Sequence, residues 1–325
     1  MTRCDGAEDR PAASAGYDRT LVAPIESRPY ARDDFPRLAE LLLVGRAAGA
    51  VEPYPSVGEL RLLLADADAI RARVWPDERD GLVAFGLFDP TWRALTFLAA
   101  PGTAPADLVP SVLAWAEETA RAHPPTEGKP LLRVRPRDTD RGLLGLLEGR
   151  GFVREGWRTL RFGRDLRGPI PAPRLPPGYA LRHLGGEHEL DAYTAMHREA
   201  FGTEHMTVER RRRLLRDPGY DPELDLVAVA PDGQLAAFVY CSVDHEENRR
   251  LSVKQGWTDP IGTRPAHRRR GLATALVLEG FRRLRARGVD RAYLGTTDGN
   301  TALRGVCAAV GYRLEHAVLA YAKAS

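Results

Sequence analysis

The stretch that decides the fold runs from Asp259 to Ala275 and reads Asp259-Pro-Ile-Gly-Thr-Arg-Pro-Ala-His-Arg-Arg-Arg-Gly-Leu-Ala-Thr-Ala275. It predicts a strand, a basic turn and the start of a helix. The extended run ends at Pro265, and apolar residues recur at helical spacing after Gly271. The first turn of a helix offers main-chain N–H groups without intrahelical partners, and the helix dipole adds partial positive charge. Gly271 lacks a Cβ, so an anion can approach the main chain, and the arginines at 268–270 can donate charge-assisted hydrogen bonds. The stretch therefore predicts a site for a phosphate or diphosphate.

Three positions of this turn resemble the diphosphate loop of the GNAT superfamily of acyl-CoA-dependent N-acyltransferases. That loop reads Gln/Arg-x-x-Gly-x-Gly/Ala, and Arg268, Gly271 and Ala273 match it. Residues 259–265 resemble the acidic-Pro-Val-Gly-Thr strand that leads into the family's loop, and Asn300 and Gly311-Tyr312 resemble its downstream residues. The resemblance implies an acetyl-CoA site formed by Ile261, Gly262, Thr263, Arg268, Arg269, Arg270, Gly271, Leu272, Ala273, Thr274 and Asn300.

Length and composition are typical of a soluble protein with two domains. The chain has 325 residues, about twice a common domain size, with 43% hydrophobic and 28% charged residues. A net charge of +3 is too small to indicate nucleic acid by itself. The three cysteines show neither metal-ligand nor disulfide spacing, which favours a reducing, cytoplasmic location. No run of about 20 apolar residues occurs, so we expect no transmembrane helix.

A proline-rich segment divides the chain. Residues 167–178 contain five prolines, which remove backbone donors and fix φ, so a semi-rigid extended linker is expected there. We expect a disordered leader at 1–24, a first domain at 25–166 and a second domain at 179–325. Asp80-Gly81 mirrors Asp232-Gly233, and Gly151-Phe152 mirrors Gly311-Tyr312, which indicates a divergent internal duplication.

Hydrophobic periodicity predicts a similar order of elements in both halves. Helices are expected after Asp33-Asp34 and after Ser56, and at 109–123, 142–148, 189–201, 207–215, 272–287 and 300–310. Strands are expected at 72–75, 82–88, 94–98, 131–134, in a run up to Phe162, and at 179–182, 224–229, 235–243, 292–295 and 318–322. The run Arg210 to Arg213 is interpreted as a solvated helix face, and His267 as an exposed loop imidazole.

The resemblance implies an α/β fold of two tandem GNAT-like domains, each a mostly antiparallel, splayed sheet flanked by helices. The loop at 100–107 in the first half contains no arginine, and Asp107 would repel a diphosphate. We therefore expect a degenerate first domain and acetyl-CoA binding in the second domain only.

Transfer of an acyl group to an amine requires the neutral amine, whereas a lysine-like amine has a pKa of about 10.4. Asp259 is the candidate base, because the resemblance places an acidic residue near the acyl group. Alternatively, Asp259 is a turn residue before Pro260. The resemblance also implies that the main-chain N–H groups of Ile261 and Thr263 bind the thioester arm and the developing oxyanion. An ordinary paired strand is the alternative for those two residues.

The residue that protonates the departing thiolate is open to two interpretations. The resemblance implies a tyrosine seven residues after Asn300, but that position is Cys307. Cys307 is a candidate general acid, or a small core residue. Asn300 itself either contacts the pantetheine arm or caps the helix that follows, and the two roles are compatible.

The sequence thus predicts an N-acyltransferase that moves an acetyl or small acyl group from acyl-CoA to a primary amine, in a ternary complex. The acceptor is a small molecule or a peptide, and the protein is a monomer or homodimer. No metal, membrane or nucleic-acid partner is expected, since the three-arginine run lacks interleaved aromatic residues. The alternative is a catalytically silent CoA-binding sensor or scaffold.

Overall fold

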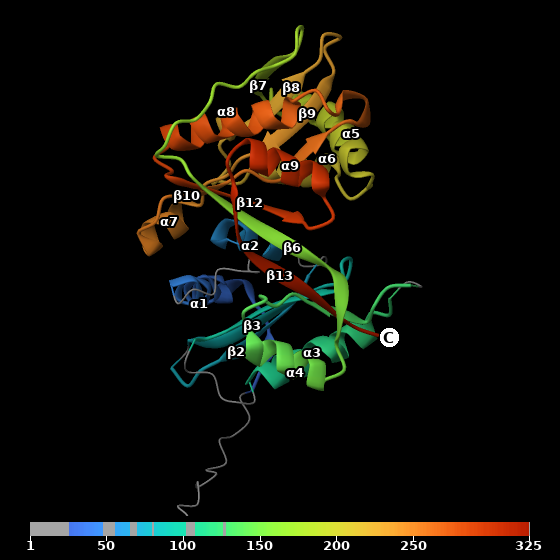
Figure 1. Ribbon diagram of the computed structural model, residues 1–325. Helices are drawn as coiled ribbons and strands as arrows, with labels where there is room; N and C mark the ends of the chain where they lie inside the picture. Colours follow the sequence, from blue (N-terminus) through green and yellow to red (C-terminus); the bar gives the residue numbers. More distant parts are fainter. Residues whose placement is uncertain are drawn as a thin grey trace, which may run out of the picture.

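The computed structural model describes residues 26–47, 56–65, 70–79, 81–101, 108–125 and 128–324 (Figure 1). The expected leader at 1–24 lies outside the described residues, as do residues 102–107 with Asp107. Two bodies of helices and strands lie above and below a pair of long strands that crosses the middle of the molecule (Figure 1).

The first half contains most elements that its periodicity predicts. Its helices are α1 (Phe35–Ala47), α2 (Val57–Leu64), α3 (Leu108–Ala122) and α4 (Arg141–Gly149). Its strands are β1 (Arg28–Pro29), β2 (Arg71–Pro76), β3 (Leu82–Asp89), β4 (Ala94–Ala99), β5 (Leu132–Val134) and β6 (Val153–Asp165). Ser56 begins α2 because its side chain accepts the Glu59 N–H at 3.2 Å, while the Glu59 carboxylate accepts the Ser56 N–H at 2.8 Å.

The second half repeats this order with additional short elements. Its helices are α5 (Leu190–Phe201), α6 (Val208–Leu215), α7 (His245–Leu251), α8 (Leu272–Ala286) and α9 (Thr301–Ala309). Its strands are β7 (Ala180–His183), β8 (Asp225–Val229), β9 (Leu235–Tyr240), β10 (Gln255–Trp257), β11 (Ile261–Thr263), β12 (Arg291–Thr297) and β13 (Arg313–Lys323). The sequence did not predict α7, because its seven residues include a single apolar side chain and so carry no helical periodicity.

The two halves share a sheet. Its nine strands are ordered β1-β2-β3-β4-β5-β13-β6-β12-β10, and a separate sheet is ordered β11-β9-β8-β7. Strand β6, from the first half, lies between β12 and β13 of the second half, and β13 pairs with β5 of the first half. The halves therefore exchange their last strands, which form the diagonal pair in Figure 1.

Helix α8 packs against β8 and β9 of the second sheet. Its buried stripe includes the expected residues Leu272, Leu276, Phe281 and Leu284. The helix ends before Gly288, whose φ of 80° suits a residue without a Cβ.

The proline-rich segment runs along α8 without regular secondary structure. Near the end of the helix, Arg285 donates to the carbonyl of Gly168 at 3.2 Å. Near its start, the Tyr179 hydroxyl and His267 Nδ1 are 2.8 Å apart. Ile170 and Leu175 pack against the core of the second half, so the segment is held on the domain rather than crossing open solvent. His267 is accordingly half-buried and hydrogen-bonded, not exposed as the sequence predicted.

The interpretation of Arg210 to Arg213 as a solvated face is wrong at one position. Arg211 is buried, with 2% of the residue exposed, and forms an ion pair with the fully buried Asp225. Its guanidinium lies 3.9 Å from the ring centroid of Tyr193. A run of four arginines hides this difference, because one residue in a short helix can face inward while its neighbours face water.

Candidate functional site

The site begins where the chain passes from one sheet to the other. Trp257 of β10 lies opposite Tyr293 in a parallel pairing with β12, and the Thr258 N–H donates to the Tyr293 carbonyl at 3.0 Å. The chain then leaves the nine-stranded sheet, and from Ile261 it pairs antiparallel with β9 of the second sheet. The peptide bond between Asp259 and Pro260 at this point is cis. The two sheets therefore diverge at Asp259.

The register of β11 determines where its main-chain N–H groups point. The carbonyl of Pro260 accepts a hydrogen bond from β9 at 3.1 Å, and the N–H of Arg264 donates to β9 at 2.9 Å. Hydrogen-bonded and non-hydrogen-bonded pairs alternate along an antiparallel ladder. Ile261 and Thr263 therefore occupy non-hydrogen-bonded positions, and their N–H groups point away from β9. They face the outer side of β11, which is the edge strand of its sheet as described.

The Asp259 side chain connects the two sheets at the point where they separate. Its Oδ2 accepts the main-chain N–H of Gly295 on β12 at 2.9 Å, in place of a strand-to-strand bond. The side chain is 29% exposed, so it remains accessible. The carboxylate thus lies at the point where β11 and β12 separate.

Arg161 is a site residue that the sequence analysis missed. It lies on β6 opposite Gly295, and its Nη1 is 3.9 Å from Asp259 Oδ2. Its guanidinium also lies 4.3 Å from the ring centroid of Trp257. The Gly295 N–H and the Arg161 guanidinium thus approach the same oxygen of the Asp259 carboxylate. No local signal identifies Arg161, because β6 belongs to the first half and reaches this site only through the exchanged strand.

The basic turn leads from β11 into α8. Gly271 has φ 80° at the N-cap, and an added Cβ would meet no atom within 4 Å, so space in front of the main chain is open. Arg269 also has a positive φ, 58°. Arg268 donates to the carbonyls of Thr263 at 3.3 Å and of Ala200 at 3.0 Å, which ties the turn to β11 and α5. Arg269 and Arg270 form no hydrogen bond or ion pair with the described residues, so both cations are available to an anion.

The other residues expected at the cofactor site differ in accessibility. Leu272 is buried, so it can offer only its main-chain N–H, whereas Ala273 and Thr274 are partly exposed. An added Cβ at Gly262 would lie 2.4 Å from the ring of Phe238 on β9 and 3.0 Å from the side chain of Ala200 on α5. Asn300 caps α9, since its side-chain oxygen accepts the Leu303 N–H at 3.1 Å.

Cys307 lies in the core of the second half with no exposed surface. Burial raises the pKa of its thiol to about 12. The position favours the packing role over proton donation, because the thiol has no access to a leaving group. Tyr312 is also buried, and its hydroxyl lies 2.8 Å from Thr258 Oγ1 and donates to the Tyr293 carbonyl at 3.2 Å.

Comparison with known proteins gives a family match in the second half of the chain. Residues 189–312 match the model of the Acetyltransferase (GNAT) family. A mycothiol acetyltransferase from Thermobispora bispora is 32% identical over 157 residues, which cover 47% of this chain and 52% of that protein. The matched part thus spans about half the length of this curated relative.

Solved structures match nearly the whole chain. A GCN5-related N-acetyltransferase from Sphaerobacter thermophilus has a TM-score of 0.69 at 23% identity, covering 92% of this chain and 95% of the other. A tandem GNAT protein from the clavulanic acid biosynthesis pathway has a TM-score of 0.70 at 18% identity, covering 91% and 97%. These likenesses confirm the expected fold class, a tandem GNAT fold. The family match lies in the second half of the chain, and the structural likeness covers nearly the whole chain.

Two further observations concern membranes and metals. Within the described ranges, no helix is both long and apolar enough to cross a membrane. The same residues include no group of three or more His, Cys, Asp or Glu side chains placed to hold a metal ion.

Proposed function

We propose that the protein is an N-acetyltransferase that transfers an acetyl or small acyl group from acyl-CoA to a primary amine of a small molecule. The observation that carries this proposal is the divergence at Asp259, where an accessible carboxylate lies beside the edge strand β11. The basic turn at the start of α8 follows Asp259 and β11 on the same segment of the chain.

The proposed chemistry is direct attack in a ternary complex. The amine nitrogen forms a bond to the thioester carbonyl carbon, and the carbon–sulfur bond then breaks to release the CoA thiolate. Asp259, directly or through a water, accepts the proton that the ammonium loses. The N–H groups of Ile261 and Thr263 stabilise the oxyanion, and the turn at 268–274 binds the diphosphate. The attacking nitrogen loses its second proton to solvent as the intermediate collapses to the amide. With Cys307 buried, we also assign to solvent the proton that the thiolate receives.

The acceptor is proposed at the level of its class. The curated relative is named for mycothiol, a small molecule, which supports a small-molecule amine over a peptide. A cytoplasmic location is part of the same proposal, since Cys241 and Cys307 are free, buried thiols.

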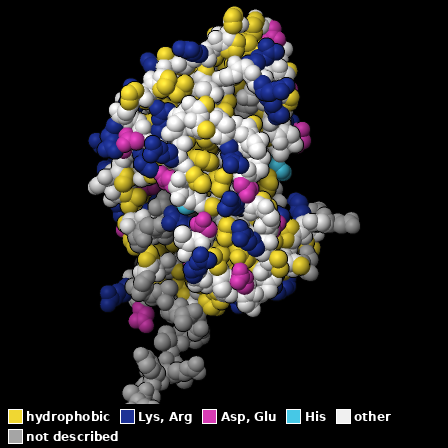
Figure 2. All heavy atoms as spheres, viewed as in Figure 1, with side chains coloured by type: hydrophobic (Ala, Val, Ile, Leu, Met, Phe, Trp, Pro, Cys, Tyr) yellow, Lys and Arg dark blue, Asp and Glu magenta, His cyan; other side chains and the backbone are white. Residues whose placement is uncertain are grey.

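A CoA-binding sensor without turnover is the second candidate, favoured by the burial of Cys307 at the position where the family motif has a proton donor. A nucleic-acid-binding module is disfavoured. On the face shown in Figure 2, basic and acidic side chains are interspersed and form no continuous basic surface.

Release of free thiol from acetyl-CoA across a panel of small-molecule amines tests the proposal. We expect release that depends on one class of amine, with the acetylated amine identified by mass spectrometry. Binding of acetyl-CoA without release for any amine would instead support the sensor. A rise in melting temperature with an oligonucleotide but not with CoA would contradict both.

A further inference from the structure

One face of the nine-stranded sheet carries basic side chains beside Asp259. Arg161 on β6 lies opposite Gly295 of β12 on one side and opposite His316 of β13 on the other. Paired residues of neighbouring strands point to the same face of a sheet, so these three positions share one face. The Cβ that Gly295 lacks would lie 3.1 Å from Arg161 Nη1 and 3.5 Å from Asp259 Oδ2, so the Asp259 carboxylate lies on that face too.

A further arginine, from the first half of the chain, lies on the same face. Arg137 forms an antiparallel bridge with Val318, which follows His316 by two residues on β13. Because side chains alternate along a strand, Val318 and its partner Arg137 point to the same face as His316. Arg137, Arg161 and His316 are called the basic face below.

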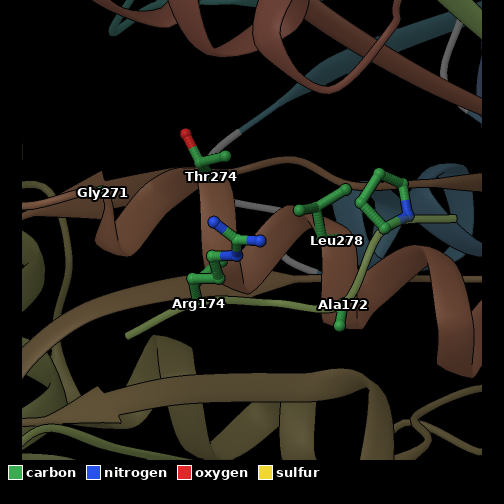
Figure 3. Close-up of a pocket in the computed structure, with 7 residues that line it drawn as sticks. Ala172, Arg174, Gly271, Thr274 and Leu278 are labelled. Carbon is green, nitrogen blue, oxygen red and sulfur yellow. The ribbon is translucent and has the colours of Figure 1, made fainter. Parts of the chain in front are cut away.

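The opposite face of the sheet packs against α8. Leu160, Leu294 and Ala317 alternate with the residues of the basic face and are buried in the core that α8 shares. A cavity of about 410 Å³ between α8 and the proline-rich segment, where Figure 3 shows Arg174 and Leu278, lies on that other side. The basic face therefore points away from α8, together with the Asp259 carboxylate.

The charges that act on His316 are predominantly positive. Burial and the neighbouring cations of Arg137 and Arg161 hold the pKa of His316 below its usual range. The carboxylates of Glu315 and Asp138 oppose this shift, but each has a smaller effect than either arginine. The electrostatic potential at the basic face is therefore positive, which favours an anion there.

Arg137 carries a cation that the described part of the chain leaves without a partner. Its side chain is half-buried, and within that part it forms no hydrogen bond or ion pair, while its Nε is fully buried. A buried polar group without a hydrogen bond is costly, and a carboxylate or phosphate can accept two parallel hydrogen bonds from one guanidinium. Arg137 is thus placed to bind an anionic group.

We propose that the acceptor bears an anionic group, a carboxylate or a phosphate, in addition to its primary amine, and that Arg137 binds this group. The inference rests on the proposed function, because Asp259 fixes the position of the amine. Neighbouring strands lie about 4.8 Å apart, so β12 and β13 are separated by about 10 Å across β6. The amine and the anionic group should therefore be several bonds apart.

This recognition would belong to the first half of the chain. Arg137 lies outside residues 189–312, the segment that matches the family. The first half would then select the acceptor by its charge, while the second half binds acetyl-CoA.

Pairs of amines that differ in charge test the inference with the full chain and acetyl-CoA. One pair is ε-aminocaproate and its neutral amide, and another is phosphoethanolamine and ethanolamine. We expect kcat/KM, followed by release of free thiol, to be about tenfold or more higher for the anionic member of at least one pair, as for one charge-assisted hydrogen bond. The pair with the larger ratio distinguishes carboxylate from phosphate, and added salt should reduce the ratio.

Three variants assign the preference to Arg137. Arg137→Gln should bring the ratio within each pair close to one, chiefly by raising KM for the anionic amine. Arg137→Lys keeps the charge but not the planar fork, so it should retain part of the ratio. Arg141→Gln, which removes an exposed arginine at the start of α4, is the matched control and should keep the full ratio. Because both amines are compared on one protein sample, a partly unfolded variant leaves the ratio unchanged.

Equal kcat/KM for the charged and neutral members of every pair in wild type, or a full ratio in Arg137→Gln, would overturn the inference and leave the proposed function standing. Absence of thiol release with every amine tested would instead contradict the proposed function, and this inference with it.

Discussion

At the scale of single residues, the site depends on the Asp259 carboxylate, which accepts a main-chain N–H that a neighbouring strand would otherwise accept. Asp259 accepts the Gly295 N–H where the two sheets separate, and Arg161 approaches the same oxygen from β6. Both interactions hold the carboxylate in one place, beside the edge strand β11. Asp259 is therefore both a turn residue and a candidate base, so the two interpretations from the sequence are compatible.

Asp259→Asn separates these roles. The amide oxygen can still accept the Gly295 N–H, so the fold should persist, but the basic group is lost. We expect turnover to fall about 10²-fold, with a smaller change in acetyl-CoA affinity and a flatter acidic limb of the pH–rate profile. Asp232→Asn, in the turn before β9, serves as the control. Unchanged turnover and pH dependence would restrict Asp259 to its structural role.

At the scale of elements, periodicity predicted most helices and strands, because most of them place apolar side chains on one buried face. It could not predict α7, which contains a single apolar residue. It also misjudged α6, where Arg211 is inward and pairs with Asp225 on β8. Composition cannot reveal which arginine of a run is buried, since that depends on the helix's partners rather than on its own residues.

The buried pair predicts how α6 is anchored. Replacing Arg211 by Met leaves the Asp225 carboxylate in the core without its cation, so the free energy of unfolding should fall by about 3 kcal/mol. Arg212→Met removes only exposed ion pairs, so it should lower the free energy of unfolding much less than Arg211→Met does. Urea unfolding of both variants measures the difference. Equal effects would show that the buried pair does not anchor the helix.

At the scale of the whole molecule, the sequence predicted two similar halves but not the exchange of strands between them. Pairing of β6 with β12, and of β13 with β5, joins residues far apart in the chain, and no local pattern encodes such a pairing. For the same reason, no local pattern indicated that Arg161 lies at the site. The boundaries proposed at 166 and 179 fall between β6 and β7. Cutting the chain there would separate β6 from β12 and β13, the two strands with which it pairs.

The exchange predicts that the halves depend on each other. Residues 179–325 expressed alone would expose the edges of β12 and β13 that β6 covers, and should be insoluble or fail to bind CoA. Co-expression with residues 1–166 should restore a soluble complex and CoA binding. Independent folding and full CoA affinity of the second half alone would show that β6 is dispensable.

The central claim is that acetyl-CoA binds where β11 leads into α8, and titration of acetyl-CoA into full-length wild type and Gly271→Glu tests it most directly. Gly271 has open space before it, so a glutamate side chain would place negative charge where the diphosphate is proposed to lie. Its φ of 80° adds some strain, and circular dichroism confirms that the variant is folded before titration. The account predicts one acetyl-CoA site in wild type and binding at least about 100-fold weaker in the folded variant. Wild-type affinity in folded Gly271→Glu would contradict it.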